Sequence, residues 1–202
     1  ARQVGKTITT VTFLLHFILF NPYKDVGILA NVGSTARKIL AKLQLAYENL
    51  PIWLQQGVVE WNKGNIELEN GSKVIATSTS SSAARGDSFA VVFVDGAAFI
   101  GTNMWEEFYT SVYPTISSGK ESKIILVSTP NGLNHFYKLF TFAMAGKNDY
   151  VPFTVTWKDV PGRDAKWRET EIRNTSPEQF LQEQECQFMG SSNTLVSSTV
   201  IK

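Results

Sequence analysis

The sequence has little of several features that would identify a class of protein at once. Its single cysteine, Cys186, allows no internal disulfide, so we expect a reducing compartment. The 19 basic and 18 acidic residues leave a net charge of +1, which excludes a strongly basic surface and restricts any nucleic-acid contact to a local patch. The longest apolar run, Phe13–Phe20, is broken by His16 and is too short to span a bilayer.

What is present is a regular alternation of strand and helix patterns in 202 residues, of which 43% are hydrophobic. The expected strands are Val26–Ala30, Val58–Trp61, Asn65–Glu69, Lys73–Ser78, Ala90–Val94, Lys123–Val127 and Val151–Trp157. The expected helices are Ile8–Phe20, Ser34–Leu50, Trp105–Val112, Leu133–Ala145 and Pro177–Met189. This order predicts an α/β fold with a mainly parallel sheet, helices on both faces, and the hairpins of residues 58–78 as an antiparallel addition at one edge. The strands near residues 26, 90 and 124 are expected to be neighbouring inner strands.

The first residues read as the end of a phosphate-binding loop. Gly5-Lys6-Thr7 is followed directly by an apolar helical segment, as in the G-x-x-x-x-G-K-[ST] pattern. Glycine lets the backbone approach a phosphate, Lys6 can reach the outer phosphates, and the Thr7 hydroxyl can ligate Mg²⁺. The first glycine of the pattern, and the strand that should lead into it, fall before Ala1. We therefore expect the sequence to be a fragment of a longer chain.

Two further strands end in residues suited to a nucleotide site. Four apolar residues lead into Asp95, an arrangement typical of a Walker B strand whose carboxylate holds the Mg²⁺ shell. The strand near residue 124 ends in Ser128 and Thr129, whose hydroxyls would face the crevice where parallel sheets bind ligands. A helix-capping aspartate and a polar turn are the alternative interpretations of these two signals.

Four segments together resemble the ATPase domain of large terminase subunits from T-even-type tailed phages. They are Ala-Arg-Gln-Val-Gly-Lys-Thr from residue 1, Val-Glu-Trp-Asn-Lys-Gly-Asn-Ile-Glu-Leu from residue 59, Ala-Arg-Gly-Asp-Ser-Phe from residue 84, and Ser-Thr-Pro-Asn-Gly-Leu-Asn-His-Phe-Tyr from residue 128. The resemblance implies a P-loop NTPase of the ASCE, or RecA-like, class that uses ATP and Mg²⁺ to drive viral DNA into a prohead. It also implies an ATPase core over residues 1–190 and a tail, 191–202, that leads toward a nuclease domain.

The resemblance assigns a role to individual residues of the loop and of the later motifs. Residues Gln3, Val4, Gly5, Lys6 and Thr7 would bind nucleotide, with Thr7 and Asp95 on Mg²⁺. Ser128 and Thr129 fall on the motif thought to relay nucleotide state to movement.

Two arginines would stabilise charge on the transferring phosphoryl group. Arg2 lies in the loop, and Arg85 matches a finger that acts on a neighbouring subunit. For Arg85, a surface salt bridge is the alternative interpretation.

The partners implied are double-stranded viral DNA, the portal protein, the small terminase subunit and further copies of the chain in a ring, with no membrane. The implied location is the host cytoplasm, at the portal vertex of the prohead during packaging and not in the mature virion.

The sequence departs from the family at Gly96. Family members have Asp-Glu at the end of the Walker B strand, and the glutamate orients the attacking water. Glycine has no side chain for this, and Glu106 and Glu107 on the next helix are not expected to reach the site. Binding of nucleotide is therefore better supported than hydrolysis. A truncated or hydrolytically impaired P-loop fragment and a helicase-like P-loop translocase remain as alternatives, although Gly96-Ala97-Ala98 does not match a helicase motif.

Overall fold

The computed structural model describes residues 1–80, 88–117 and 122–190. The chain divides into two compact units. One comprises Gly5–Ser128, and the other joins Ala1–Val4 to the segment from Thr129 onward. Each unit is described by itself below. No helix in the described residues is long and apolar enough to cross a membrane.

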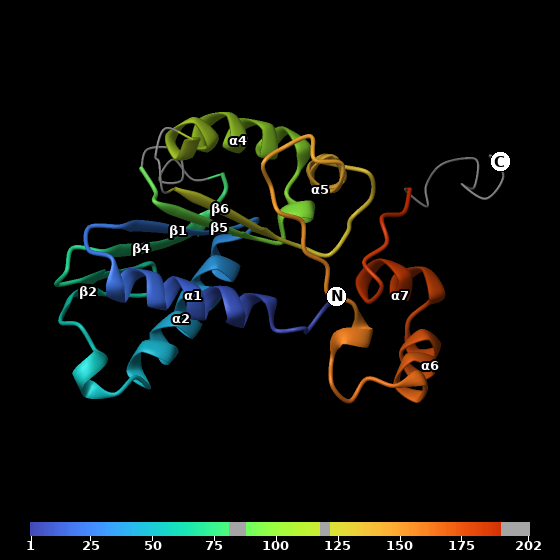
Figure 1. The fold of residues 1–202 in the computed structure, drawn as a ribbon, viewed down its shortest axis with the longest axis horizontal. Coiled ribbons are helices and arrows are strands. Elements are labelled where there is room, and N and C mark those ends of the chain that lie inside the picture. The colour runs from blue at the N-terminus through green and yellow to red at the C-terminus, as the bar shows by residue number, and fades with distance from the viewer. Residues whose placement is uncertain (81–87, 118–121, 191–202) are drawn as a thin grey trace. The chain divides into compact units, whose positions relative to one another are not determined.

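A six-stranded mixed sheet forms the centre of the unit Gly5–Ser128 (Figure 1). Its order is β2-β3-β4-β1-β5-β6, with β1 parallel to β4 and β5, and β5 parallel to β6. The hairpin of β2 and β3 extends the β4 edge in antiparallel pairing, as the sequence predicted. The strands are β1 (Asp25–Ala30), β2 (Val58–Trp61), β3 (Asn65–Leu68), β4 (Lys73–Ser78), β5 (Val91–Asp95) and β6 (Lys123–Val127).

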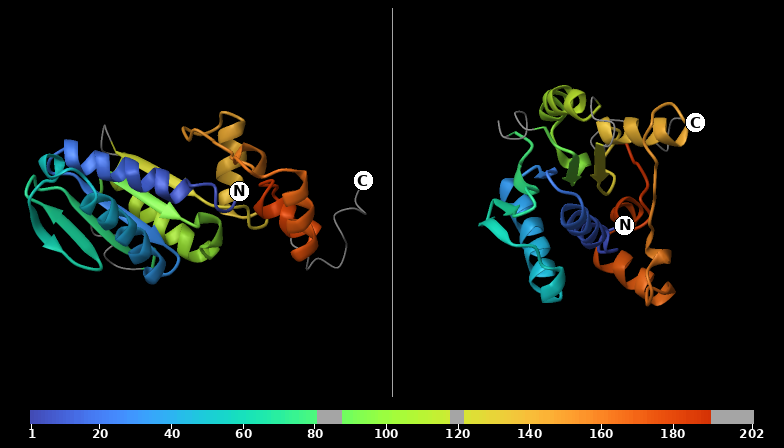
Figure 2. Two further views of the ribbon diagram at one scale, coloured as in Figure 1. Left: turned by 90° about the horizontal axis from the view of Figure 1, so that it is seen from below. Right: turned by 60° about the vertical axis from the view of Figure 1, so that its left-hand side comes forward.

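Helices cover both faces of this sheet (Figures 1 and 2). On one face lie α1 (Lys6–Phe20) and α2 (Gly33–Glu48), and on the other lies α4 (Thr102–Ser117). Successive residues of a strand point to opposite faces of the sheet, and in β1 and β5 the residues on both faces are buried. Burial on both faces explains why the sequences of these two strands are almost continuously apolar. Two short 3₁₀ helices, η1 (Ile52–Leu54) and η2 (Ala97–Phe99), complete the unit.

The main core lies between the sheet and the two helices α1 and α2. Both helices place apolar side chains at spacings of three and four, which forms one stripe toward the strands. The fully or almost fully buried members from the helices are Val11, Leu14, Leu15, Ile18, Leu19, Ala36, Ile39, Leu40, Leu43 and Tyr47. Burial of a Leu or Ile side chain stabilises the fold by about 1.5–3 kcal/mol, so this stripe fixes both helices on the sheet.

The unit that contains Thr129 onward is mainly helical. Its elements are α5 (His135–Met144), η3 (Trp157–Asp159), α6 (Ala165–Asn174) and α7 (Pro177–Glu183). Side chains of Asn134, Asp164 and Ser176 cap α5, α6 and α7 by accepting backbone N–H groups. An aromatic cluster of Trp157, Trp167 and Phe180, with ring centroids 6.0–6.2 Å apart, joins η3, α6 and α7.

The structure corrects the sequence prediction in several places. The three strands β1, β5 and β6 are neighbours as expected, but β6 is the outer strand of the described sheet and not an inner one. Residues 151–156 form no strand and Trp157 begins η3, because a β-like pattern forms a strand only where a neighbouring backbone completes the ladder. Helix α6 was not predicted, and α7 ends at Glu183, six residues before the predicted end.

We expect Gly27→Ala to destabilise the sheet unit. A Cβ at this position in β1 would lie 3.2 Å from two ring atoms of Phe89, which is 1% exposed. Overpacking of this kind costs about 1–3 kcal/mol, measured as a lower midpoint of urea unfolding. In the control Gly101→Ala, the new Cβ meets no atom within 4 Å, and a change within about 0.5 kcal/mol is expected. Equal midpoints for the two variants would contradict this packing argument.

Candidate functional site

The carboxyl ends of three parallel strands meet at one edge of the sheet. The register pairs Ala30 with Asp95 and Asp95 with Val127, so the three residues lie at one level across β1, β5 and β6. The turn that follows β5 is tied to the end of β6. Gly96 N–H donates to the Val127 carbonyl oxygen at 2.8 Å, and Ala98 N–H donates to Ser128 Oγ at 3.1 Å. Asp95 and Ser128 are therefore held by one hydrogen-bonded frame.

Helix α1 begins in a way that suits an anion. Its N-cap is Gly5 in a left-handed conformation with φ 83°, which glycine adopts without steric strain. No side chain caps the helix, and its first turn contains no acidic residue. The N–H groups of the first turn have no partner within the helix, and they carry the positive end of the helix dipole. This geometry is the one that binds phosphate at helix N-termini.

Lys6 connects the start of α1 to the strand ends. Its ammonium donates to the carbonyl oxygen of Ser128 at 3.2 Å, one residue beyond the end of β6. Its positive charge also acts on the Asp95 carboxylate and favours the ionised form. The structure thus brings a helix N-terminus, a lysine and a carboxylate to the same edge of the sheet. Together they can hold an anion and a cation side by side.

The electrostatics of Asp95 oppose its ionised form. Burial is the largest influence and raises the pKa of this carboxyl above its usual value of 3.8. The charges of Lys6 and Lys42, and the backbone N–H of Gly96, act in the opposite direction without cancelling it. Sequence reasoning did not identify Lys42, because its proximity to Asp95 arises only from the packing of α2. A divalent cation at this carboxylate would favour the ionised form.

The donor atoms available fit magnesium. Thr7, in the first turn of α1, and Asp95 both offer oxygen, the ligand type that Mg²⁺ prefers. No group of three or more His, Cys, Asp or Glu side chains gathers anywhere in the described residues.

The first loop residues have well-defined partners within their own unit. Arg2 forms an ion pair with Glu183 at 2.9 Å, and its backbone N–H donates to the Glu183 carbonyl oxygen at 3.0 Å. The guanidinium of Arg163 donates to the carbonyl oxygens of Arg2 and Gln3 at 3.1–3.3 Å, while lying over the Trp167 ring. Arg163 and Glu183 therefore fix the loop backbone. No motif in the sequence pointed to either residue.

The remaining predicted residues are placed as follows. Val4 is half-buried and Thr129 is 6% exposed, both in the unit that holds Arg2. Arg85 lies outside the described residues. Gly96 has φ 70° and ψ 34°, the left-handed conformation, and a Cβ there would meet no atom within 4 Å.

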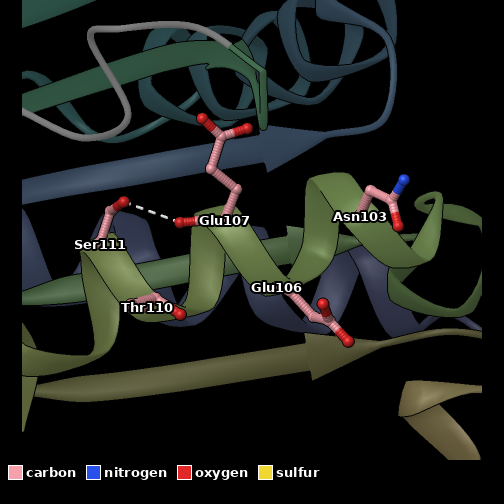
Figure 3. A pocket seen from close by; sticks show the side chains of 5 residues that line it. All are labelled: Asn103, Glu106, Glu107, Thr110 and Ser111. Atoms are coloured by element: carbon pink, nitrogen blue, oxygen red, sulfur yellow. Dashed lines mark hydrogen bonds between the residues drawn. The ribbon is translucent and has the colours of Figure 1, made fainter.

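A surface depression of about 410 Å³ lies on α4 and is separate from the residues above. Asn103, Glu106, Glu107, Thr110 and Ser111 line it. Figure 3 shows that the carboxylates of Glu106 and Glu107 leave the helix in different directions and do not converge. All five residues come from one helix surface, so the depression contains neither a lysine nor a loop that could hold a phosphate.

The six-stranded sheet and the helices that cover it share the fold of solved phage large terminases. The chain belongs to the family described as terminase large subunit, T4likevirus-type, N-terminal, which matches residues 1–202. The resemblance seen in the sequence is therefore confirmed at the level of family and fold.

The solved structures to which this chain is similar include large terminases of several phages. The ATPase domain from Thermus phage P74-26 is 21% identical, with a TM-score of 0.70 over 93% of this chain and 86% of that chain. The large terminase of bacteriophage HK97 is 16% identical, with a TM-score of 0.73 over 93% of this chain and 45% of that one. The large terminase of a thermophilic bacteriophage, in complex with ATP-gamma-S, is 13% identical, with a TM-score of 0.70 over 93% and 46%. At these identities the likeness shows the fold.

We expect Asp95→Asn to raise the melting temperature at pH 7 in the absence of nucleotide and metal. The folded chain binds a proton at Asp95 more tightly than the unfolded chain does, so stability falls as the pH rises through the raised pKa. Asparagine removes this penalty. The advantage of the variant should shrink as the pH falls through the raised pKa and should vanish below 3.8, where the carboxyl is protonated in the folded and the unfolded chain alike.

The control is Glu48→Gln at the exposed end of α2, which removes one carboxylate and leaves the site intact. A melting temperature for Asp95→Asn below that of the unchanged chain at pH 7 would contradict the proposed burial penalty.

Proposed function

We propose that this chain is the ATPase motor domain of a phage large terminase, in which binding of ATP and Mg²⁺ is coupled to movement of double-stranded viral DNA into a prohead. The observation that carries the proposal is the position of Lys6. It joins an uncapped helix N-terminus to the end of β6, beside the carboxylate of Asp95. Two structures of the large terminase from the thermophilic bacteriophage are described as complexes with ATP-gamma-S and with ADP, which supports a nucleotide as the ligand.

Each residue of the site has a role in this proposal. Lys6 neutralises the outer phosphates, and the backbone N–H groups of residues 3–7 surround them. Arg2 stabilises charge on the transferred phosphoryl group, and Arg85 does so for a neighbouring subunit. Thr7 and Asp95 hold the cation. When bound, Mg²⁺ would neutralise phosphate charge and orient the phosphate oxygens.

Ser128 and Thr129 are proposed to relay the state of the nucleotide. The support is a short chain of contacts: Lys6 donates to the Ser128 carbonyl oxygen, and Ser128 Oγ accepts from Ala98 in the turn after Asp95. A change in the position of Lys6 on a phosphate would act directly on this backbone. The side chain and the carbonyl of Ser128 thus connect the two halves of the proposed phosphate and metal site.

The wider assembly belongs to the same proposal. In it the chain acts with the portal protein, the small terminase subunit and further copies of itself in a ring, at the portal vertex in the host cytoplasm. Family membership supports the partners. The modest net charge of +1 fits a chain that meets DNA through a limited surface.

Lys6→Ala is expected to weaken ATP binding by about 10- to 100-fold, because a charge-assisted hydrogen bond contributes about 1.5–3 kcal/mol. Calorimetry or a fluorescent ATP analogue measures the change. Lys138→Ala, an exposed lysine on α5, is the control and should bind ATP unchanged. Equal affinities for the two variants would remove Lys6 from the phosphate site.

Gly96 favours a second candidate, a domain that binds nucleotide but hydrolyses it slowly. Its left-handed backbone suits glycine, and the position offers no group to orient water. In this candidate, nucleotide affinity is retained and the chemical step is impaired.

Gly96→Glu in the full-length protein should raise kcat by about 10²–10⁴-fold with little change in ATP affinity, because general-base catalysis acts in the transition state. A Cβ at Gly96 would meet no atom within 4 Å, while the left-handed backbone costs about 1–2 kcal/mol of stability. Gly96→Gln carries the same strain without the carboxylate and should leave kcat low. Brisk hydrolysis by the unchanged protein, with no gain from glutamate, would place the base elsewhere.

A further inference from the structure

A depression of about 250 Å³ is lined by residues of α2 and of the turn between β2 and β3. Arg37, Lys38, Ala41, Gln44 and Lys63 line it. Three of these five side chains are cations, and all three are exposed. The depression is separate from the residues assigned above to nucleotide and metal.

The depression is built by a fixed contact between the helix and the hairpin. Gln44 Nε2 donates to the backbone carbonyl oxygen of Asn62 at 2.9 Å. Asn62 Oδ1 in turn accepts the backbone N–H groups of Gly64 and Asn65 at 2.7 and 2.9 Å, which closes the turn. Lys63 is one of the residues of this turn, and its side chain is exposed. The hydrogen bonds therefore hold its backbone beside α2, where Arg37 and Gln44 lie on one helix face at i and i+7.

No acidic residue offsets these cations within α2, whose only carboxylate is Glu48 at its last residue. The neighbouring strands β2 and β3 contribute two acidic residues, Glu60 and Glu67, and Glu60 lies at the same turn as Lys63 without forming an ion pair with it. Glu67 pairs with Lys73 at 3.1 Å, and the carboxylate of Glu60 accepts from the amides of Asn62 and Asn65, both at 2.8 Å. Among the described residues, no ion pair is made by the three cations that line the depression.

We infer that this surface, defined by Arg37, Lys38 and Lys63, binds the phosphate backbone of duplex DNA. The inference rests on the proposed function and names the part of the chain that meets the DNA. Ala41 is the one apolar side chain of the lining, so an apolar ligand would gain little here. Duplex DNA carries one negative charge for each 1.7 Å or so of its axis, which matches several unpaired cations on one small surface. Exposed lysine and arginine side chains contact the phosphate groups whatever the base sequence is.

The test is the salt dependence of binding to a short duplex, followed by fluorescence anisotropy. The variant combines Arg37→Gln, Lys38→Gln and Lys63→Gln. The plot of log affinity against log salt should become flatter by about 2 to 3, because each lost phosphate contact removes about 0.9 from the slope. Two duplexes of unrelated sequence should show the same loss.

The matched control combines Lys138→Gln, Lys147→Gln and Lys166→Gln, three exposed lysines outside α2 and the hairpin. It changes the net charge equally and should keep the original slope. Circular dichroism and ATP affinity of both variants should match the unchanged chain. The inference is overturned if the two variants lose the same slope, if neither loses any, or if the unchanged chain does not bind duplex DNA at low salt. Loss of ATP binding in Lys6→Ala tests the nucleotide site separately, so failure of either proposal is distinguishable.

Discussion

The in-register parallel pairing of β5 with β1 and β6 is the constraint on which the site depends. It places Asp95 opposite Ala30 and Val127, and therefore places Ser128 one residue beyond the sheet edge. A slip of one residue would turn the Asp95 side chain to the opposite face of the sheet and separate it from Lys6. The hydrogen bonds of Gly96 and Ala98 to the end of β6 then fix the turn that follows.

Two features of the candidate site lower the stability of the folded sheet unit. The carboxyl of Asp95 stands at the end of four buried residues, and its burial disfavours the charged form. Helix α1 begins without a capping side chain or an acidic residue in its first turn. Either feature alone would be a local defect in a packed domain. Their occurrence at one edge, joined by Lys6, is the pattern of a site that is completed by a charged ligand.

Much of the sheet unit could be predicted from the sequence, because β-branched apolar runs such as residues 91–94 determine buried strands by themselves. The helix α6 was missed because its sequence, AKWRETEIRN, has almost no apolar stripe; the helix is held by the contacts of Trp167 with Trp157 and Phe180. Conversely, Val151 and Phe153 gave a strand pattern, yet both are exposed and have no ladder partner. A local sequence pattern indicates which secondary structure a segment can adopt, and long-range contacts determine which one it adopts in the fold.

The same distinction applies to the site. The motif residues Lys6 and Asp95 could be predicted to meet, because the carboxyl ends of parallel strands share one edge. The partners that tune or hold them, Lys42 for Asp95 and Arg163 for the loop backbone, come from distant parts of the chain and belong to no motif.

The backbone conformation at Gly96 suits the glycine that stands where the family has glutamate. Any residue with a side chain would be strained at φ 70°. The backbone conformation at this position therefore favours glycine. The hydrogen bonds on either side, from Gly96 N–H to β6 and from Ala98 N–H to Ser128, hold this turn in place. The next acidic residues after Gly96 along the chain, Glu106 and Glu107, leave α4 in different directions and line a depression of their own. Sequence and backbone at Gly96 therefore agree with each other, and any group that orients water must come from a residue other than these.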